Sequence, residues 1–431
     1  MLDIKLIRED PEMVRKNLEK RHDPVAIEKL DDLIKIDKEW REVLQELNDS
    51  RKRRNEVTGE IAELKREGKD IKKHVKEIQE LPKKIKELEE KEADLKEKLK
   101  PKLMGIPNLL HKSVPFGKDE NDNVEIKRWG KIPEFGFQPK SHIEILENLD
   151  LVESERAVKI SGMGFFYEKE ELALLDLALQ RFAIDFLRKR SYKLIIPPFM
   201  MRRKPYEGVT DMESFNDVMY KIQDEDLHLI ATSEHPMAAM FMDEVIEKKD
   251  LPIKFCGLSP CFRKEIGSHG KYTKGFFRMH QFHKIEQFIF CLPEDSWKFH
   301  EELQHNTEEM LKVLGLTYRV VNVCTGDIGS IAAKKYDTEI WMADKEFREV
   351  GSNSNCTDYQ ARRLNIKFRE KEGQPPVDFV HTLNNTGIAT SRVMIAIIEQ
   401  NQQKDGSVVI PTVLKEYMGG IEKLEKKYES S

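Results

Sequence analysis

The chain has 431 residues, which at roughly 150 residues per domain predicts two or three domains. Charged residues make up 35 % of it, but 73 Lys and Arg against 78 Asp and Glu leave a net charge of only −5, which argues against a uniformly basic nucleic-acid-binding surface and leaves a local basic patch open. No apolar run approaches the roughly 18 residues of a membrane span, and the first residues are too charged for a signal peptide, so we expect a soluble cytoplasmic protein.

Residues 31–100 form a highly charged segment, with 20 Lys and Arg and 20 Asp and Glu. Apolar residues recur there at steps of three and four, from Leu33 to Leu64 and again from Ile71 to Leu99, which is typical of a coiled-coil seam. Gly68 separates the two runs, and Lys100-Pro101 ends the second. We therefore predict an antiparallel helical hairpin over about 27–100, about 45 to 55 Å long at 1.5 Å per residue.

Positive charge gathers at the predicted tip of this arm, because residues 51–76 contain ten Lys and Arg but only five Asp and Glu. Taken alone, such a run is more often a solvated helix face. An isolated two-helix arm buries little apolar surface, however, and a phosphate-rich partner would explain why it projects so far. The candidate contacts are Arg51, Lys52, Arg53, Arg54, Lys65, Arg66, Lys69, Lys72, Lys73 and Lys76.

Residues 106–123 are rich in Pro, Gly, Asn and Asp, so the domain boundary is placed there, with an N-terminal helical domain over 1–110 and a second domain over 111–431. The second domain mixes both kinds of element, and short connections among its strands predict a mainly antiparallel sheet flanked by helices, an α+β fold. The expected helices cover 171–190, 235–248, 294–314 and 388–403, and the expected strands 193–196, 227–231, 254–258, 276–290, 318–323 and 376–382.

The chain has neither of the glycine-rich phosphate-binding loops, so any ATP must be held by side chains. Residues 261–290 read as two strands joined by a Gly/Lys-rich loop. Alternation would place Arg263 with Glu265 on one face of the first strand, and Arg278, Phe282 and Glu286 on one face of the second. Phe282 and Glu286 would lie roughly 13 Å apart, about the length of an aminoacyl adenylate. A half-buried strand with surface ion pairs is the alternative.

Three further clusters carry suitable chemistry. Thr232 and Glu234 offer a hydroxyl and a carboxylate on one side of the chain, although Thr232 or Ser233 would equally suit a helix cap. Glu349 and Ser352 supply two oxygens for a hard cation such as Mg²⁺, or simply a polar turn. Arg392 begins an almost wholly apolar helix, where a buried guanidinium needs a salt bridge or a bound phosphate.

The five cysteines include no Cys-x-x-Cys pair. Cys256 and Cys261 precede His269, His280 and His283, but this spacing matches no zinc pattern known to us. Buried thiols in a reducing compartment are the simpler interpretation.

Together these motifs resemble seryl-tRNA synthetase, a class II aminoacyl-tRNA synthetase. The resemblance rests on Thr-Ser-Glu at 232–234, Phe-Arg-x-Glu at 262–265 with Arg-x-His-Gln-Phe-x-Lys-x-Glu at 278–286, the run at 349–363, and His-Thr-Leu-Asn-x-Thr-Gly at 381–387 followed by Arg392. It extends from the helical arm to Glu-Tyr-Met-Gly-Gly at 416–420. It implies ATP-dependent activation of L-serine to seryl-adenylate and transfer to the 3′ end of tRNA(Ser), with tRNA(Sec) left open as a second acceptor.

The resemblance also implies a role for each matching residue. Arg263, Arg278 and Arg392 would be catalytic through the phosphates. ATP would be bound by Arg263, Lys264, Glu265, Met279, Phe282, Glu349, Val350, Gly351, Ser352 and Arg392, and Mg²⁺ by Glu349 and Ser352. Serine would be bound by Thr232, Ser233, Glu234, Arg263, Glu286, Asn384 and Thr386.

The same resemblance assigns the arm to the tRNA and residues 192–200, with Pro197-Pro198, to a homodimer interface. It implies the ordinary pocket without zinc. Asn385 stands where the family often has Gly, and Ser233 where bacterial members often have Ala. Two alternatives are a synthetase-like ligase that loads a carrier protein, and a non-catalytic coiled-coil scaffold. The arm argues against the first, and the presence of Arg263, Glu286 and Arg392 against the second.

Overall fold

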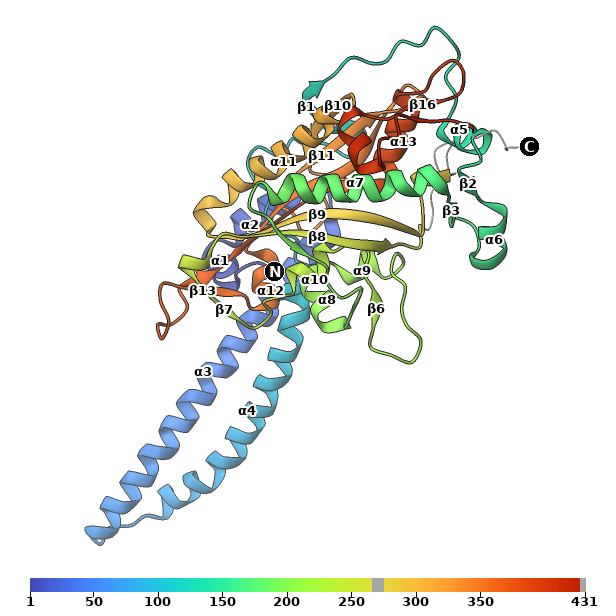
Figure 1. Ribbon diagram of the computed structural model, residues 1–431. Helices are drawn as coiled ribbons and strands as arrows, with labels where there is room; N and C mark the ends of the chain where they lie inside the picture. Colours follow the sequence, from blue (N-terminus) through green and yellow to red (C-terminus); the bar gives the residue numbers. More distant parts are fainter. Residues whose placement is uncertain (266–274, 427–431) are drawn as a thin grey trace. The chain divides into compact units, whose positions relative to one another are not determined.

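The computed structural model describes residues 1–265 and 275–426, and the chain divides into two compact units, 1–109 and 110–431 (Figure 1). The first unit is helical, with α1 (Ile4–Glu9), α2 (Pro11–Glu19), α3 (Pro24–Arg66) and α4 (Lys72–Met104). Aspartates at the N-caps of α1, α2 and α3 accept backbone N–H groups, and proline stands at the first position of α2 and α3. These are ordinary start signals for helices.

The long helices α3 and α4 form the predicted antiparallel pair. Val43 and Leu47 of α3 pack with Ile85, Leu88 and Leu95 of α4 in one buried cluster. Gly68 has φ +65 in the turn between the helices, a conformation that favours glycine. The prediction that Lys100-Pro101 ends the arm is wrong, because α4 includes Pro101 and continues to Met104.

Ion pairs between the two helices engage part of the basic tip. Arg51 lies 2.7 Å from Glu89, and Arg53 lies 2.6 Å from Glu77. Surface pairs of this kind stabilise little, but they tie both arginines to the opposite helix.

The second unit is built on an eight-stranded sheet in the order β1-β10-β11-β12-β15-β9-β8-β4. All neighbouring strands are antiparallel except β4 and β8, so the predicted fold class is confirmed. The strands are β1 (Val124–Trp129), β4 (Lys193–Ile195), β8 (Ile253–Phe262), β9 (Gln281–Cys291), β10 (Tyr318–Asn322), β11 (Lys334–Trp341), β12 (Phe347–Thr357) and β15 (His381–Ala389).

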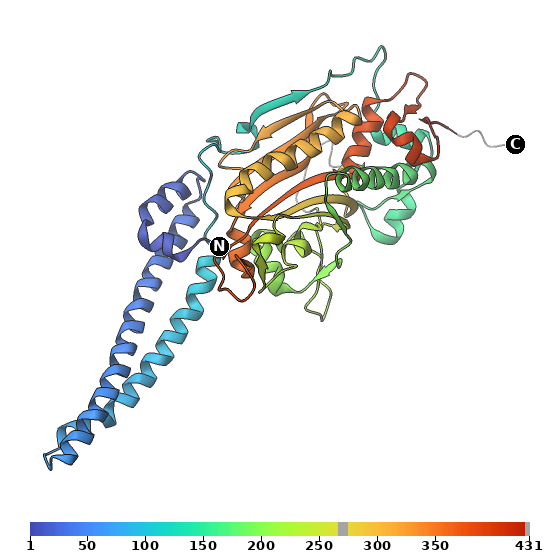
Figure 2. The same ribbon diagram turned by 60° about the vertical axis from the view of Figure 1, so that its left-hand side comes forward.

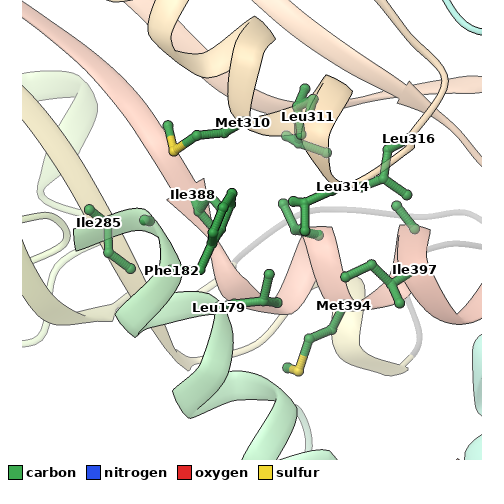
Figure 3. Close-up of a cluster of buried hydrophobic side chains, with 14 of the residues drawn as sticks. Leu179, Phe182, Ile285, Met310, Leu311, Leu314, Leu316, Ile388, Met394 and Ile397 are labelled. Carbon is green, nitrogen blue, oxygen red and sulfur yellow. The ribbon is translucent and has the colours of Figure 1, made fainter. Parts of the chain in front are cut away.

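One face of the sheet is covered by α7 (Glu170–Arg188), α11 (Ser296–Val313) and α13 (Thr390–Gln400), as Figure 2 shows. Leu179 and Phe182 of α7 meet Met310 and Leu311 of α11 and Met394 of α13 in the main core (Figure 3). Alternation along β9 divides its side chains between two cores. Ile285 and Ile289 join this one, whereas Phe288 and Phe290 join a second core on the opposite face.

Shorter elements lie on that opposite face. They include α8 (Arg203–Val209), α10 (Glu234–Ala238) and α12 (Tyr359–Leu364), and a small sheet of β14 (Asp378–Phe379), β13 (Lys367–Arg369) and β7 (Val245–Glu247). The remaining helices are α5 (His142–Asn148), α6 (Glu155–Ser161), α9 (Met212–Phe215) and α14 (Thr412–Lys415), with 3₁₀ turns at Glu120–Asp122, Lys248–Asp250, Gly275–Phe277, Pro293–Asp295 and Glu416–Met418. Short strand pairs are β2 (Val152–Glu153) with β3 (Tyr167–Glu168), β5 (Met200–Met201) with β6 (His228–Leu229), and β16 (Val408–Val409) with β17 (Lys423–Leu424).

Several predicted elements are wrong. The helix expected over 235–248 ends at Ala238 and is followed by β7, and the strand expected over 276–290 begins only at Gln281. The strand expected over 376–382 is two strands, β14 and β15. Strands β1, β11 and β12 were not predicted. The sequence of β12 is as polar as that of a loop, which is why no strand was predicted there. Its polar side chains can nevertheless be buried because they find partners inside the protein: Asn353 Nδ2 donates to His300 O of α11 at 2.9 Å.

Among the described residues, none of the helices combines the length and the apolar character needed to cross a lipid bilayer.

Candidate active site

A pocket of about 650 Å³ opens on the sheet where β8, β9, β12 and β15 meet the start of α13. It brings together fourteen of the seventeen predicted site residues. These are Thr232, Glu234, Arg263, Glu265, Arg278, Phe282, Glu286, Glu349, Val350, Gly351, Ser352, Asn384, Thr386 and Arg392.

Strand β9 forms the floor of the pocket with alternate side chains. Phe282, Lys284 and Glu286 all line it, as expected for positions two apart on one face. Arg263 reaches the same place from the end of β8, with its Cζ 5.4 Å from the centre of the Phe282 ring and its Nε donating to Ala231 O at 3.3 Å.

The expected strand positions of three of these residues are wrong. β8 ends at Phe262, before Arg263 and Glu265, and β9 begins after Arg278. Chain turns rather than pleat alternation therefore bring these three to the pocket. Arg263 N–H donates to His280 O at 3.0 Å, which holds the two chain segments together, and Arg278 Nη1 lies 3.6 Å from Glu265 Oε2.

Acidic and amide groups gather at one end of the pocket. Asn384 Nδ2 donates to Glu234 Oε2 at 3.0 Å and to Glu286 Oε1 at 3.2 Å, so one amide bridges two carboxylates. Lys284 Nζ lies 2.7 Å from Glu286 Oε2, and both of these side chains are buried. Thr386, which is paired with Glu286 across the strands, closes this end.

Burial and charge shift two pKa values at this end. Burial, together with the nearby carboxylate of Glu286, raises the pKa of Glu234 to about 7 against the opposing effect of Lys284. Burial lowers the pKa of His235 to about 3, aided by Lys284 and Arg263. His235 is therefore neutral near pH 7, and about half of Glu234 is ionised.

Oxygen ligands and a guanidinium lie at the other end. Ser352 Oγ donates to Glu349 Oε1 at 3.3 Å, and Arg392 Nη1 donates to Glu349 O at 2.8 Å. Burial alone would raise the pKa of Glu349, but Arg392, Lys335 and Arg263 hold it below its usual value. An ionised carboxylate beside a hydroxyl is a donor pair that suits Mg²⁺.

Three predicted residues do not line the pocket. Ser233 is buried and its Oγ donates to Gly257 O at 3.2 Å, and Met279 packs in the main core. Lys264 lies with its Nζ 5.9 Å from the centre of the Tyr220 ring. Direct contact of the Ser233 and Met279 side chains with a ligand in this pocket is therefore not supported.

The thiols and imidazoles considered for zinc have separate surroundings. Burial raises the pKa of Cys256 to about 12 and also raises that of Cys261. His280 contacts the Tyr220 hydroxyl, and His283 Nδ1 lies 3.0 Å from Asp176 Oδ2. His269 and the Gly/Lys-rich loop lie outside the described residues. Within 1–265 and 275–426, no group of three or more His, Cys, Asp or Glu side chains is placed to hold a metal ion.

Comparison with known proteins identifies the family. Residues 1–110 match the seryl-tRNA synthetase N-terminal domain, and residues 219–401 match the class II tRNA synthetase core domain (G, H, P, S and T). The serine–tRNA ligase of Methanospirillum hungatei is 54 % identical over 97 % of this chain and 99 % of its own length. The chain belongs to the seryl-tRNA synthetase family.

Solved structures of seryl-tRNA synthetases agree with the fold. The Pyrococcus horikoshii enzyme, solved with ATP, has a TM-score of 0.96 and 47 % identity over 99 % of this chain and all of its own. The cytoplasmic Naegleria fowleri serine–tRNA ligase, solved with AMP, has a TM-score of 0.88 and 36 % identity over 99 % of both chains. The predicted family and the predicted ligase class are confirmed, and the two alternatives are not favoured.

The two departures from the usual seryl-tRNA synthetase pattern lie outside the pocket. Asn385 is buried, and its Nδ2 donates to Leu303 O at 2.7 Å and to Thr307 Oγ1 at 3.0 Å. Thr307 Oγ1 in turn donates to Thr386 O at 2.8 Å. Asn385 thus anchors β15 to α11 from behind, while its neighbours Asn384 and Thr386 face the pocket.

Two charged residues that line this pocket, Asp211 and Lys284, were not among the predicted site residues. The alternation that selects Phe282 and Glu286 also selects the position between them, so the signal was present. The wall formed by residues 328–332 was missed because its Ile, Gly, Ser and Ala side chains carry no distinctive chemistry.

Proposed function

We propose that this pocket activates L-serine with ATP and transfers the seryl group to the 3′ end of tRNA(Ser), the reaction of a serine–tRNA ligase. One observation carries the proposal: a single face of β9 presents an aromatic plate, Phe282, and a carboxylate, Glu286, at opposite ends of a pocket lined by Arg263. Their separation of roughly 13 Å suits seryl-adenylate.

ATP would occupy the arginine-rich side of the pocket. Phe282 would stack on adenine, with Met279 contributing backbone only, and Glu265 would position the nucleotide. Arg263 would hold the α-phosphate, while Arg278 and Arg392 would hold the γ-phosphate. Guanidinium groups suit this task because they stay charged and donate in a planar fork.

Glu349 and Ser352 would hold Mg²⁺, which supplies positive charge to the phosphates when it is bound. Their fit rests on the ionised Glu349 carboxylate and on a Ser352 hydroxyl 3.3 Å away from it. Both belong to β12, whose pairing with β11 fixes their backbone. Val350 and Gly351 lie between them on this nucleotide-facing segment.

Serine would occupy the acidic end. Glu286 and Thr386 would read its ammonium and hydroxyl groups together with Thr232, and Glu234 would line the site. Asn384 would support both carboxylates, as its hydrogen bonds to them already do in the free pocket. Ser233 would act only through the backbone that it fastens to Gly257.

Activation needs no general base, because the serine carboxylate is ionised at neutral pH. A carboxylate oxygen attacks the α-phosphorus, and the bond to pyrophosphate breaks. The arginines lower the barrier by offsetting charge that accumulates on the phosphates and by aligning the reacting groups. A ribose hydroxyl of the tRNA then attacks the acyl carbon, and AMP leaves.

Polar recognition would reject alanine. Without a hydroxyl on the ligand, buried groups around Glu286 and Thr386 lose a partner, at a cost of about 1 to 3 kcal/mol per group. Threonine would have to be excluded by crowding, since it carries the same hydroxyl and one additional methyl group.

The arm would bind tRNA through the cations of its tip. Lys65, Arg66, Lys72, Lys73 and Lys76 are exposed, and their charges suit backbone phosphates. Whether tRNA(Sec) is also charged stays a prediction, as does a cytoplasmic location.

A homodimer is supported by the sheet edge at β4. This strand ends the eight-stranded sheet, and Leu194, Ile196 and Met200 in and after it are 42 %, 62 % and 44 % exposed. An apolar sheet edge is normally covered. A second copy of the chain would cover this edge, in agreement with the resemblance that assigns residues 192–200 to a homodimer interface.

The Glu286→Gln variant tests the serine site. We expect serine-dependent pyrophosphate exchange to fall strongly through a higher KM for serine, because the amide carries no charge for the serine ammonium. ATP binding should change little. Glu309→Gln, on α11 away from the pocket, is the matched control. Unchanged exchange in Glu286→Gln would refute the assignment.

A further inference from the structure

Lys284 is a buried cation in the middle of the pocket floor. Its side chain is 8 % exposed, and its Nζ lies 2.7 Å from Glu286 Oε2. On the neighbouring strands it is paired with Ser259 of β8 and Ala389 of β15. Directly opposed residues share one face of a sheet, so small side chains flank Lys284 on both sides, and Lys284 itself lines the pocket.

The position of Lys284 matches the centre of the proposed ligand. It stands two residues from Phe282 and two from Glu286, roughly 6.6 Å from each along the strand. In seryl-adenylate, the bond between the acyl group and the phosphate lies between adenine and the amino group. Lys284 is therefore placed beside the reacting carboxylate rather than beside the adenine or the ammonium.

Each oxygen of Glu286 already has a neighbour in the free pocket, but only Oε1 accepts a hydrogen bond, and Oε2 has an ion pair without hydrogen-bond geometry. Oε1 accepts from Asn384 Nδ2 at 3.2 Å, and Oε2 faces Lys284 Nζ. A serine ammonium that binds Glu286 must therefore share or replace one of these partners. Replacement of Asn384 would also break its link to Glu234. Among the described residues, Lys284 Nζ makes no second ion pair, so Lys284 can leave Glu286 without breaking another charge contact.

Serine enters as a zwitterion, and each of its charges needs an opposite charge once water is removed. We infer that Lys284 exchanges partners when serine binds: the serine ammonium replaces Lys284 at Glu286, and the released Lys284 ammonium binds the serine carboxylate. Two ion pairs replace one, and the exchange of partners forms and breaks no covalent bond. This inference rests on the proposed serine site.

The exchange makes Lys284 a recognition residue for the amino-acid carboxylate. Arg263 lies in the same pocket and shares that task, so removal of Lys284 weakens carboxylate recognition without abolishing it. Once the carboxylate has joined the α-phosphorus, its charge is lost, and the inference predicts that Lys284 then pairs with a phosphate oxygen of the adenylate.

The test compares L-serine with L-serinamide, which keeps the ammonium and hydroxyl groups and lacks the carboxylate. Both are measured on the full-length protein, serine by its KM in pyrophosphate exchange and serinamide as an inhibitor competitive with serine. In Lys284→Met we expect the preference for serine over serinamide to fall about tenfold or more, because the variant loses the buried ion pair with the serine carboxylate. The KM for ATP should stay within about twofold, and Lys284→Arg should restore most of the preference.

The matched control is Lys254→Met. Lys254 of β8 also pairs with a glutamate, Glu302 of α11 at 2.7 Å, but Lys254 lies outside the pocket. It should leave the preference unchanged. If Lys284 only holds Glu286 in place, Lys284→Met will change serine and serinamide binding by the same factor, and that result would overturn the inference.

Two further measurements keep the outcomes separate. If Lys284→Met does not fold, Lys284→Gln is measured in its place. A crystal structure of the wild-type protein with serine provides a test that needs no variant. That structure should place Nζ within about 3.2 Å of a serine carboxylate oxygen and farther from Glu286. Nζ still paired with Glu286 would contradict the exchange. A KM for serine that is unchanged in Glu286→Gln would instead refute the proposed serine site, on which the inference rests.

Discussion

Serine binding should release a proton from Glu234 when the pH is below 7. Burial and the neighbouring Glu286 carboxylate together raise the pKa of this carboxyl to about 7. The serine ammonium favours the ionised form of a nearby carboxylate. A protonated Glu234 must therefore lose its proton for the strongest binding, whereas an already ionised one has nothing to release.

The size of the effect follows from the titration. With a pKa of about 7, Glu234 is about 9 % ionised at pH 6 and about 91 % ionised at pH 8. If only the ionised form binds serine, the apparent Kd is divided by the ionised fraction, so serine binds about tenfold more weakly at pH 6 than at pH 8. The proton release is about 0.9 per serine at pH 6 and about 0.1 at pH 8.

Calorimetric titration with serine, in buffers of different ionisation enthalpy, measures both quantities. His235 does not interfere, because its pKa of about 3 keeps it neutral over this range. Glu234→Gln should show neither the proton release nor the tenfold change between pH 6 and pH 8. A wild-type release near zero at pH 6, or an unchanged release in the variant, would refute the reasoning.

Three other variants test separate parts of the protein. Deletion of residues 31–100 should leave pyrophosphate exchange intact and abolish tRNA charging, while charging by the intact enzyme should fall as salt rises because phosphate contacts are screened; charging retained after deletion would rule the arm out. Phe282→Ala should raise the KM for ATP about five- to hundredfold, the value of one base–aromatic stack at about 1 to 3 kcal/mol, with little change in the KM for serine; equal loss for both would argue against stacking. Glu349→Gln should raise the Mg²⁺ concentration for half-maximal exchange about tenfold or more, and an unchanged Mg²⁺ dependence would exclude it as a ligand.

The apolar pattern of the sequence predicted the helices and the turn whose formation depends mainly on residues close together in the chain. The sequence predicts the coiled-coil seam of the arm because each helix must bury one apolar stripe against the other. It also predicts the turn at Gly68, because glycine readily adopts the positive φ that the structure has there. The apolar pattern of α11 and α13 was readable for the same reason.

Burial in the tertiary structure reversed other predictions. β12 was missed because its asparagines are buried with partners on α11, which gives a buried strand the composition of a loop. The apolar run after Glu234 predicts a long helix, yet α10 ends at Ala238. Its apolar residues pack in the second core without continuing the helix.

The sequence by itself determined which chemical groups are available for a site, because each residue type carries its own aromatic, guanidinium, hydroxyl or carboxylate side chain. It also determined that Phe282 and Glu286 share a face, since pleating is local. Only the tertiary structure decided that Arg263, Glu349, Asn384 and Arg392 converge there, and that Lys284 neutralises Glu286. Convergence depends on strand order and on turns between distant segments, and no residue carries that information alone.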